Sequence, residues 1–587
     1  MAEQRCAGGY AMTAAANRQP EPQNNGTTAE NTRQLRMTML AFVLGSIILY
    51  APLIGWGVPH ATAPDRTKTF ATDEILPLEG LAEMHNTFVV SKPDRNYGYP
   101  WWHYFVVSSA QAPYVGYLLV SGAMESSQPE YPFGMRDPVA ALVWLTLIGR
   151  FVSVLMGAGI VAAAYYFSRT LWGHQTGVIA ALLTMLNYLM FYYSRTGNLD
   201  VPAFFWSSLG LAVLAKVMVA GLTARRAGWL GVFVGLAIAT KDQSLVIFLP
   251  LICLLLLPRF VRSLDMRSRL RSLLIGLAAF VIVYLIGTGM LVDPQRHLTH
   301  VHALFFEPER VTGASAYWPP HPKTLAGTAN LFGDYLQKLV SMSSLPVLLA
   351  SLVGALLIWR SAPRMLVLLL PVMSLFLLLI LPAGIAPLRY LLPLTLILDA
   401  FAAFAVITLH RSGWRMVWIP LLVLLCGWRL MVGVDLSYAQ YRDTRYSASA
   451  WIKENARGGN RLEYFGASET LPHLSSEIIT GPVAGRTRWV GETGHGPAVL
   501  RYLEEEGPEY VIIVPDWTSQ PGMERSADCP PEVYAALIDG DIGYTQAAYF
   551  PPRSLLGGPL SRPALDNPSV CPPVRLFTRD EMSRRGE

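Results

Sequence analysis

Charged side chains are scarce in this chain: Asp, Glu, Lys and Arg make up 15% of its 587 residues, whereas hydrophobic residues make up 52%. Soluble domains usually contain about 25% charged residues. The formal net charge is only +5, which is too small for this length to favour a nucleic-acid-binding protein. Because the shortage of charge coincides with long apolar runs, the composition indicates an integral membrane protein.

Cysteine is also rare, and none of the five cysteines belongs to a CxxC pair. This absence argues against a zinc ribbon or a dithiol redox motif. Cys253 and Cys426 lie inside apolar runs and are expected to be small core residues. Cys6 lies near the N-terminus, whereas Cys529 and Cys571 share the polar C-terminal region, where a disulfide and two free thiols are equally open interpretations.

Two further features are missing. The first 34 residues lack the basic segment and short apolar run of a signal peptide, and their polar composition predicts a disordered N-terminus. No internal repeat is evident, which weakens a transporter interpretation because many transporters are built from repeats.

What the chain does have is a series of apolar runs. Since a membrane span needs roughly 20 apolar residues, we expect about eleven transmembrane helices. Their ranges are 36–57, 139–167, 173–193, 201–220, 229–240, 244–257, 272–291, 336–358, 365–381, 390–409 and 417–434. The two short runs, 229–240 and 244–257, predict a hairpin of tilted helices around Lys241. The aromatic segment 96–124 is expected to lie in the membrane interface, with a twelfth span as the alternative.

Lys and Arg concentrate in alternate loops, and these loops are assigned to the cytoplasm. The residues concerned are Arg33, Arg36, Arg169, Lys216, Arg225, Arg226, Arg259, Arg262, Arg267, Arg269, Arg271, Arg360, Arg364, Arg411 and Arg415. The pattern predicts a multi-pass protein of the cytoplasmic (inner) membrane with a cytoplasmic N-terminus. The loops 58–138 and 292–335 and the C-terminal region then lie outside.

The pattern divides the chain into three parts: a disordered cytoplasmic segment 1–34, a transmembrane domain 35–434 and a soluble extracytoplasmic domain 435–587. The last part alternates helical segments (448–456 and 499–506) with strand-like ones (462–465, 510–514, 542–550 and 574–577), separated by Pro and Gly. The expected fold class is therefore an α-helical polytopic membrane protein with a small C-terminal α/β domain.

Two adjacent acids, Asp73 and Glu74, follow the first apolar run. A carboxylate at the rim of an apolar groove can accept the proton of an acceptor hydroxyl during group transfer, and desolvation would make it a better base. The alternative is structural, because acids also favour the first turn of a helix.

Three charged residues stand at the outer ends of later runs: Asp200, Lys241 and Arg389, the last followed by Tyr390. Cations on this face run against the charge rule, so they require an explanation. Coordination of a phosphate is one, and snorkelling toward lipid headgroups is the other. Arg150 and Asp399 lie within runs, where pairing inside the helix bundle is expected.

The metal-binding patterns are weak. His297, His300 and His302 lack a clear carboxylate companion and are interpreted as ordinary surface histidines. The Asp539-Gly540-Asp541 sequence is interpreted as a turn before a strand.

Six segments carry a family resemblance: the acidic pair, LIGRFVSVLMG around Arg150, LWGHQTGVIA, SRTGNLDVPAFFW, GLAIATKDQSLVIFLP and RYLLPL. In this order, over residues 36–409, they resemble the GT-C class of membrane glycosyltransferases, of the protein O-mannosyltransferase and aminoarabinose-transferase type (glycosyltransferase family 39-like). The HPPL-like stretch of that family appears here only as Tyr99-Pro100-Trp101-Trp102, and no MIR-type repeat follows.

The resemblance implies an enzyme that moves a hexosyl or pentosyl unit from a polyprenyl phosphate to an extracytoplasmic glycan, lipid or protein, with inversion. It implies a catalytic role near the acceptor for Asp73, with Glu74 beside it. The resemblance also implies donor binding by Asp200, Lys241, Arg389, Tyr390 and Arg150, in which Lys241 and Arg389 bind the donor phosphate. No metal ligand and no cofactor is assigned, and a divalent metal is left open. The alternatives are a flippase of lipid-linked sugars, an oligosaccharide ligase or polymerase, and an inactive scaffold.

Overall fold

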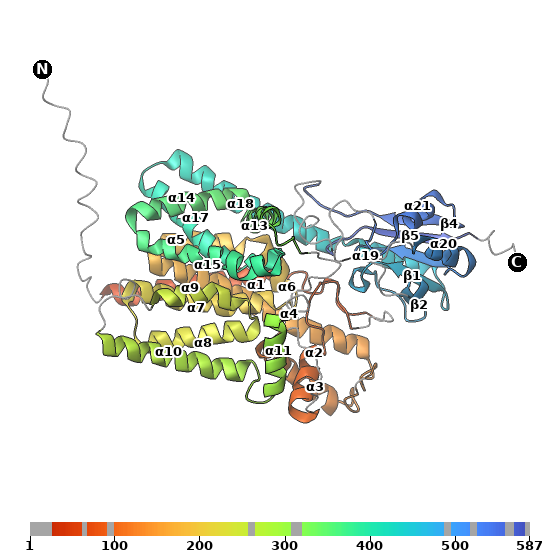
Figure 1. The fold of residues 1–587 in the computed structure, drawn as a ribbon, viewed down its shortest axis with the longest axis horizontal. Coiled ribbons are helices and arrows are strands. Elements are labelled where there is room, and N and C mark those ends of the chain that lie inside the picture. The colour runs from red at the N-terminus through yellow and green to blue at the C-terminus, as the bar shows by residue number, and fades with distance from the viewer. Residues whose placement is uncertain are drawn as a thin grey trace, which may run out of the picture.

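The computed structural model describes residues 26–60, 67–90, 99–128, 130–255, 265–306, 320–485, 495–516, 525–557 and 569–580. A bundle of helices forms the larger part of the molecule, and a five-stranded sheet flanked by helices lies beyond one end of the bundle (Figure 1). This arrangement confirms the predicted fold class, a polytopic helical protein with a small C-terminal α/β domain.

Within the described ranges, the helical part runs through twenty-one elements. They are α1 (Gly26–Tyr50), α2 (Glu79–His85), η2 (Asn86–Val90), α3 (Trp102–Val120), α4 (Pro138–Trp172), α5 (His174–Met185), α6 (Tyr188–Arg195), α7 (Asp200–Ala220), α8 (Ala224–Thr240), α9 (Ser244–Leu255), α10 (Met266–Gly287), α11 (Pro294–Phe306), α13 (Leu325–Ser343), α14 (Leu345–Ser361), η4 (Pro363–Leu369), α15 (Leu370–Leu375), η5 (Phe376–Ile380), α16 (Leu381–Ala383), η6 (Leu388–Leu391), α17 (Leu394–Arg411) and α18 (Arg415–Tyr441).

In the described part of the chain, seven helices are long and apolar enough to cross a membrane, or up to nine if each of two bent pairs counts as one span. The number is lower than the expected eleven because some apolar runs form short helices. α8 has 17 residues, so it extends for about 26 Å, less than the roughly 30 Å of a bilayer core, and α9 is described over 12 residues. α3, in the aromatic segment, is not among the seven.

Two broken helices meet at a buried ion pair. The α5–α6 pair bends by 61° and the α13–α14 pair by 100°, and each break frees backbone carbonyls that need donors at membrane depth. Arg429 of α18 supplies them, donating to the carbonyl oxygens of Leu183 and Ser343 at 2.5 and 2.9 Å. Its charge is balanced by Asp399 of α17 at 2.8 Å, which confirms the expected pairing of that acid.

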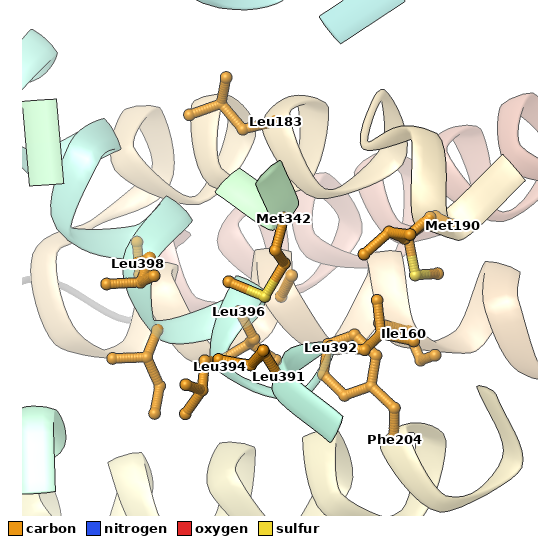
Figure 2. Close-up of a cluster of buried hydrophobic side chains, with 14 of the residues drawn as sticks. Ile160, Leu183, Met190, Phe204, Met342, Leu391, Leu392, Leu394, Leu396 and Leu398 are labelled. Atoms are coloured by element: carbon orange, nitrogen blue, oxygen red, sulfur yellow. The ribbon is translucent and has the colours of Figure 1, made fainter. Parts of the chain in front are cut away.

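The centre of the bundle is packed with aliphatic side chains. Leu391 of η6, the following Leu392 and the first turns of α17 lie in one cluster with side chains from five other helices (Figure 2). These partners are Ile160, Leu183, Met190, Phe204 and Met342. The packing fixes η6, and therefore the Arg389 backbone, against the helices that carry the other site residues.

The C-terminal domain is built on strands β1 (Arg461–Phe465), β2 (Ile479–Pro482), β3 (Tyr510–Ile513), β4 (Tyr544–Phe550) and β5 (Val574–Arg579). Their order is β2-β1-β3-β5-β4; β1 pairs in parallel with β2 and β3, and β5 pairs antiparallel with β3 and β4. Helices α19 (Thr444–Asn455), α20 (Gly496–Glu505) and α21 (Pro531–Asp539) complete it, with the short turns η7 (Ser468–Thr470) and η8 (Val483–Gly485).

Several local expectations need correction or comment. Residues 26–34, expected to be disordered, form the first turns of α1, while residues 1–25 lie outside the described part. The division at residue 434 falls inside α18. Cys529 and Cys571 are both buried and free, so they form no disulfide. Gly540 ends α21 in a left-handed turn, as expected for Asp539-Gly540-Asp541.

Candidate active site

The acidic pair does not lie in a helix, because the next helix, α2, begins only at Glu79. The helix-capping interpretation of Asp73 and Glu74 is therefore wrong. The two side chains instead occupy opposite environments. Glu74 is buried, whereas the Asp73 side chain is 45% exposed.

Glu74 is held by four donors. Arg150 of α4 donates to its two carboxylate oxygens from Nε and Nη2, each at 2.7 Å. The backbone N–H of Gly197 donates at 2.6 Å and the Thr69 hydroxyl at 2.5 Å. A buried carboxylate is tolerated only when it is paired and hydrogen-bonded in this way.

Arg150 is itself fully engaged. In addition to Glu74, its Nη1 donates to the backbone oxygens of Ile54 and Trp56 at 2.7 and 2.6 Å. The side chain is completely buried, which confirms that it pairs inside the protein. Arg150 thus ties the segment after α1 and the acidic pair to the middle of α4.

Asp73 is turned outward by its backbone. Its φ is 57°, in the left-handed region that non-glycine residues seldom adopt, and such strain persists only where neighbours impose it. The neighbours are identifiable: Asn198 donates to the Thr72 carbonyl at 2.7 Å, and Ile75 donates to the Gly197 carbonyl at 3.3 Å. The outward carboxylate forms an ion pair with Arg389.

The second cation is positioned by the end of a helix. Lys241 is the C-cap of α8, and its Nζ lies 2.7 Å from Oδ1 of Asp200, the first residue of α7. Both side chains are almost completely buried. The rings of Tyr390 and Tyr99 lie 5.2 and 5.7 Å from the ammonium, close enough for a cation–π interaction.

The electrostatics keep both cations charged. Burial opposes the charge of Lys241, but the Asp200 carboxylate attracts it, and its pKa stands above the usual value. Burial likewise opposes the charge of Arg389, while Asp73 raises its pKa well above the usual range. Burial raises the pKa of the Tyr99 phenol, so this hydroxyl remains neutral and able to donate.

The structure therefore brings together Asp73, Arg389, Lys241, Asp200 and Tyr390, the residues that sequence reasoning had singled out at the ends of separate runs. They come from the loop after α1, η6, the α8–α9 turn and the start of α7. Glu74 and Arg150 lie behind them and support the loop.

Residues 146–286 match the dolichyl-phosphate-mannose-protein mannosyltransferase family. The matched segment carries Arg150, Asp200 and Lys241, and the match confirms the predicted resemblance to the GT-C glycosyltransferases. The protein is thus similar to a family of membrane glycosyltransferases. No curated protein matches the chain.

Several solved structures resemble most of the chain weakly. ArnT from Cupriavidus metallidurans in the apo state is 13% identical with a TM-score of 0.47, over 92% of this chain and 97% of that chain. AglB from Archaeoglobus fulgidus, in complex with an inhibitory peptide and a dolichol-phosphate, is 13% identical with a TM-score of 0.43, over 81% of this chain and 69% of that chain. The arabinofuranosyltransferase AftD from Mycobacteria is 15% identical with a TM-score of 0.39, over 94% of this chain and 42% of that chain.

Sequence reasoning missed some residues of the site. Tyr99 was noted only as part of a departure from the family pattern, yet its ring faces Lys241. Gly197 was quoted within a motif without a role; a Cβ at this position would meet the Glu74 carboxylate at 3.0 Å. The only sequence signal for Gly197 was its place in the SRTGNLD motif. Its role could not be predicted, because it contacts Glu74, a residue distant in sequence.

The histidine-rich segment forms α11. His300 lies 2.9 Å from Asp242, the residue after Lys241, and Arg296 forms an ion pair with Glu83 of α2. Within the described ranges, no group of three or more His, Cys, Asp or Glu side chains is arranged to hold a metal ion. α11 therefore connects the α8–α9 turn to α2.

The C-terminal domain contacts the segment that leads to the acidic pair. The Trp56 indole donates to Asp443 at 3.0 Å, and Lys68 pairs with Glu469 at 2.7 Å. Arg445 lies over the Phe70 ring at 3.6 Å from its centroid. The domain thus supports the same segment that Arg150 holds through the Trp56 carbonyl oxygen.

Proposed function

We propose that the protein is a membrane glycosyltransferase that moves a hexosyl or pentosyl unit from a polyprenyl phosphate to an acceptor hydroxyl, with inversion at the anomeric carbon. The observation that carries the proposal is the placement of a strained, outward carboxylate, Asp73, against one member of a pair of cations, Arg389 and Lys241. The match to a family that uses a dolichyl phosphate sugar supports it.

The donor phosphate would bind between Lys241 and Arg389. Arg presents two parallel donors to a phosphate and Lys a point charge. Both cations already pair with carboxylates. When the phosphate binds, it replaces Asp73 as the partner of Arg389, whereas Lys241 keeps its ion pair with Asp200 and also contacts the phosphate. The Tyr390 and Tyr99 rings shield the ammonium from water and strengthen its attraction to the phosphate.

Loss of Arg389 as a partner makes Asp73 a stronger base at the moment the donor is bound. The acceptor hydroxyl then gives its proton to Asp73 as its oxygen forms a bond to the anomeric carbon. The bond from that carbon to the phosphate oxygen breaks on the opposite face, and the electron pair leaves with the polyprenyl phosphate. The two cations stabilise this leaving group, so a separate general acid is unnecessary.

Glu74 and Arg150 act as positioning residues in this proposal, because neither has a free polar face toward the site. Their ion pair, with Gly197 and Asn198, imposes the left-handed backbone of Asp73. A displacement of about 1 Å in a reacting group can cost 100-fold in rate, so this support matters for catalysis.

The decisive experiment is transfer from a synthetic polyprenyl-phosphate sugar by the purified, reconstituted protein. Wild-type protein should release polyprenyl phosphate and add one sugar to the acceptor, with the anomeric configuration inverted. D73N should bind the donor but not transfer it. Movement of the lipid-linked sugar across the bilayer without transfer would instead indicate a flippase, and addition of a whole glycan would indicate a ligase or polymerase.

The sidedness is also part of the proposal: the site and the residues from 435 onward face the extracytoplasmic side of the cytoplasmic membrane, and the N-terminus faces the cytoplasm. In a cysteine-free background, S126C in the first outer loop should react with an impermeant thiol reagent in intact cells. S361C, at the end of α14, should react only after the cells are opened. Both serines are exposed, so equal labelling in intact cells would reject this orientation.

A further inference from the structure

Two apolar grooves lie at the end of α8 and α10 that is farthest from Lys241. α8 has 17 residues, so its first turn is about 25 Å from Lys241 along the axis. Both grooves are shallow and open to the surroundings, and they share one wall residue, Ile275. The larger is lined by Arg267, Leu270, Arg271, Leu274, Ile275 and Ala278, and the smaller by Ala224, Arg225, Gly228, Trp229, Val232, Ile275 and Ala279.

The grooves lie on the outside of a tightly packed helix pair. A Cβ on Gly231 of α8 would meet the carbonyl oxygen of Gly276 of α10 at 2.1 Å, so the two backbones are in contact and nothing can enter between them. On the outer surface, Leu270, Leu274 and Trp229 remain about half exposed. Hydrocarbon chains of the surrounding bilayer can therefore reach both grooves.

Each groove carries arginine at the same end. Arg225 lines the smaller groove, and Arg267 and Arg271 line the larger one. All three are exposed, and no ion pair connects any of them to an acid in the described part of the chain. The adjacent Arg226 differs, because its Nη1 caps α7 by donating to the carbonyls of Ala220 and Gly221 at 2.7 and 2.6 Å.

The acid nearest in sequence is already engaged. Asp265 is the N-cap of α10, and its carboxylate accepts from the backbone N–H of Ser268 at 3.2 Å. The three arginines thus leave a local excess of positive charge at the mouth of two apolar grooves. Arginines that act only as topology anchors require no such grooves.

We propose that this surface binds one anionic diacyl phospholipid, with its phosphate between Arg225, Arg267 and Arg271 and one acyl chain on each side of Ile275. The charge complements the headgroup, since basic residues near the membrane surface attract anionic lipid. The two grooves match two chains, whereas the single chain of a polyprenyl phosphate would fill only one. The site is separate from the proposed glycosyltransferase site and does not depend on it.

The test is native mass spectrometry of the purified full-length protein, titrated with phosphatidylglycerol, phosphatidylcholine and single-chain lysophosphatidylglycerol. Wild-type protein should retain phosphatidylglycerol in preference to both other lipids. R225Q, R267Q and R271Q should each weaken its binding by roughly fivefold. R360Q, which removes an exposed arginine at the end of α14, should have no effect.

A second pair of variants preserves every charge. G228L fills the smaller groove, and the position accepts a side chain because a Cβ there would lie 3.7 Å from the Ile275 side chain; A278F fills the larger groove. With each variant, the protein should bind phosphatidylglycerol no more tightly than single-chain lysophosphatidylglycerol. An equal effect of R360Q, an absence of preference for anionic lipid, or displacement of the lipid by polyprenyl phosphate would overturn the proposal.

Discussion

Replacing Glu74 by Gln would leave Arg150 charged in a site where its side chain is completely buried. The carboxylate now accepts from Arg150 Nε and Nη2 at 2.7 Å and from the Gly197 N–H at 2.6 Å. Breaking a buried ion pair by removing one partner usually destabilises a protein by about 3–5 kcal/mol. We expect E74Q to lower the free energy of unfolding by about that amount and to reduce transfer strongly, because the Asp73 loop loses its support.

Two comparison variants make this measurable by denaturant unfolding in detergent. E125Q removes an exposed carboxylate that lies 3.9 Å from Arg136, and such surface pairs contribute only about 0–1 kcal/mol. The double variant E74Q/R150Q should recover part of the stability lost in E74Q, because the uncompensated charge is gone. If E74Q and E125Q shift the unfolding midpoint equally, the Glu74–Arg150 pair does not hold the loop as we argue.

D73N should lower the turnover of transfer by about 100- to 10,000-fold, the usual contribution of a general base. Donor binding should be at least as tight as in the wild type, because the phosphate no longer competes with the Asp73 carboxylate for Arg389. Residual turnover near the wild-type value would contradict the assignment. K241M should weaken donor binding by about 10- to 100-fold, because a charged hydrogen bond contributes roughly 1.5–3 kcal/mol. The double variant D200N/K241M should be more stable than K241M. Equal donor affinity in wild type and K241M, measured by titration with labelled lipid, would exclude a role of Lys241 in phosphate binding. Burial lowers the pKa of His473 to about 4, below its ordinary 6.5, so the folded state favours the neutral ring. The contribution of the neutral His473 ring to folding stability should be complete above pH 6.5 and should be lost as the pH falls toward 4. Between these values the unfolding midpoint of H473F should depend less on pH than that of the wild type, and parallel pH profiles would refute this.

The transmembrane helices could be predicted from the sequence because a spanning segment must satisfy its own backbone hydrogen bonds, which makes long apolar runs decisive. Asp73, Lys241 and Arg389 could also be singled out, since charges at the ends of apolar runs are conspicuous. The number of long helices was not predicted, because the run 336–358 breaks at Ser344, whose φ is 68°. Pro346, at the start of α14, was the local signal of this break.

The partners of these residues depend on tertiary packing. Glu74 and Arg150 are 76 residues apart, and Asp73 and Arg389 are 316 residues apart, so no sequence period connects them. The same reason explains why β2 was missed: its sequence, Ile-Thr-Gly-Pro, has no apolar alternation, and it becomes a strand by pairing with β1. The roles of the site residues remain predictions that the variants above would test.

The helix α18 (Arg415–Tyr441) links the bundle to the C-terminal domain as one continuous helix, with Pro420 near its start. A helix turns by about 100° per residue, so inserting one residue near its end would swing the whole sheet around the axis and carry Asp443 away from the Trp56 indole. Inserting seven residues, close to two full turns, would restore the direction but lift the sheet by about 10 Å. Chimaeras that exchange the C-terminal domain must therefore keep the length of this helix constant.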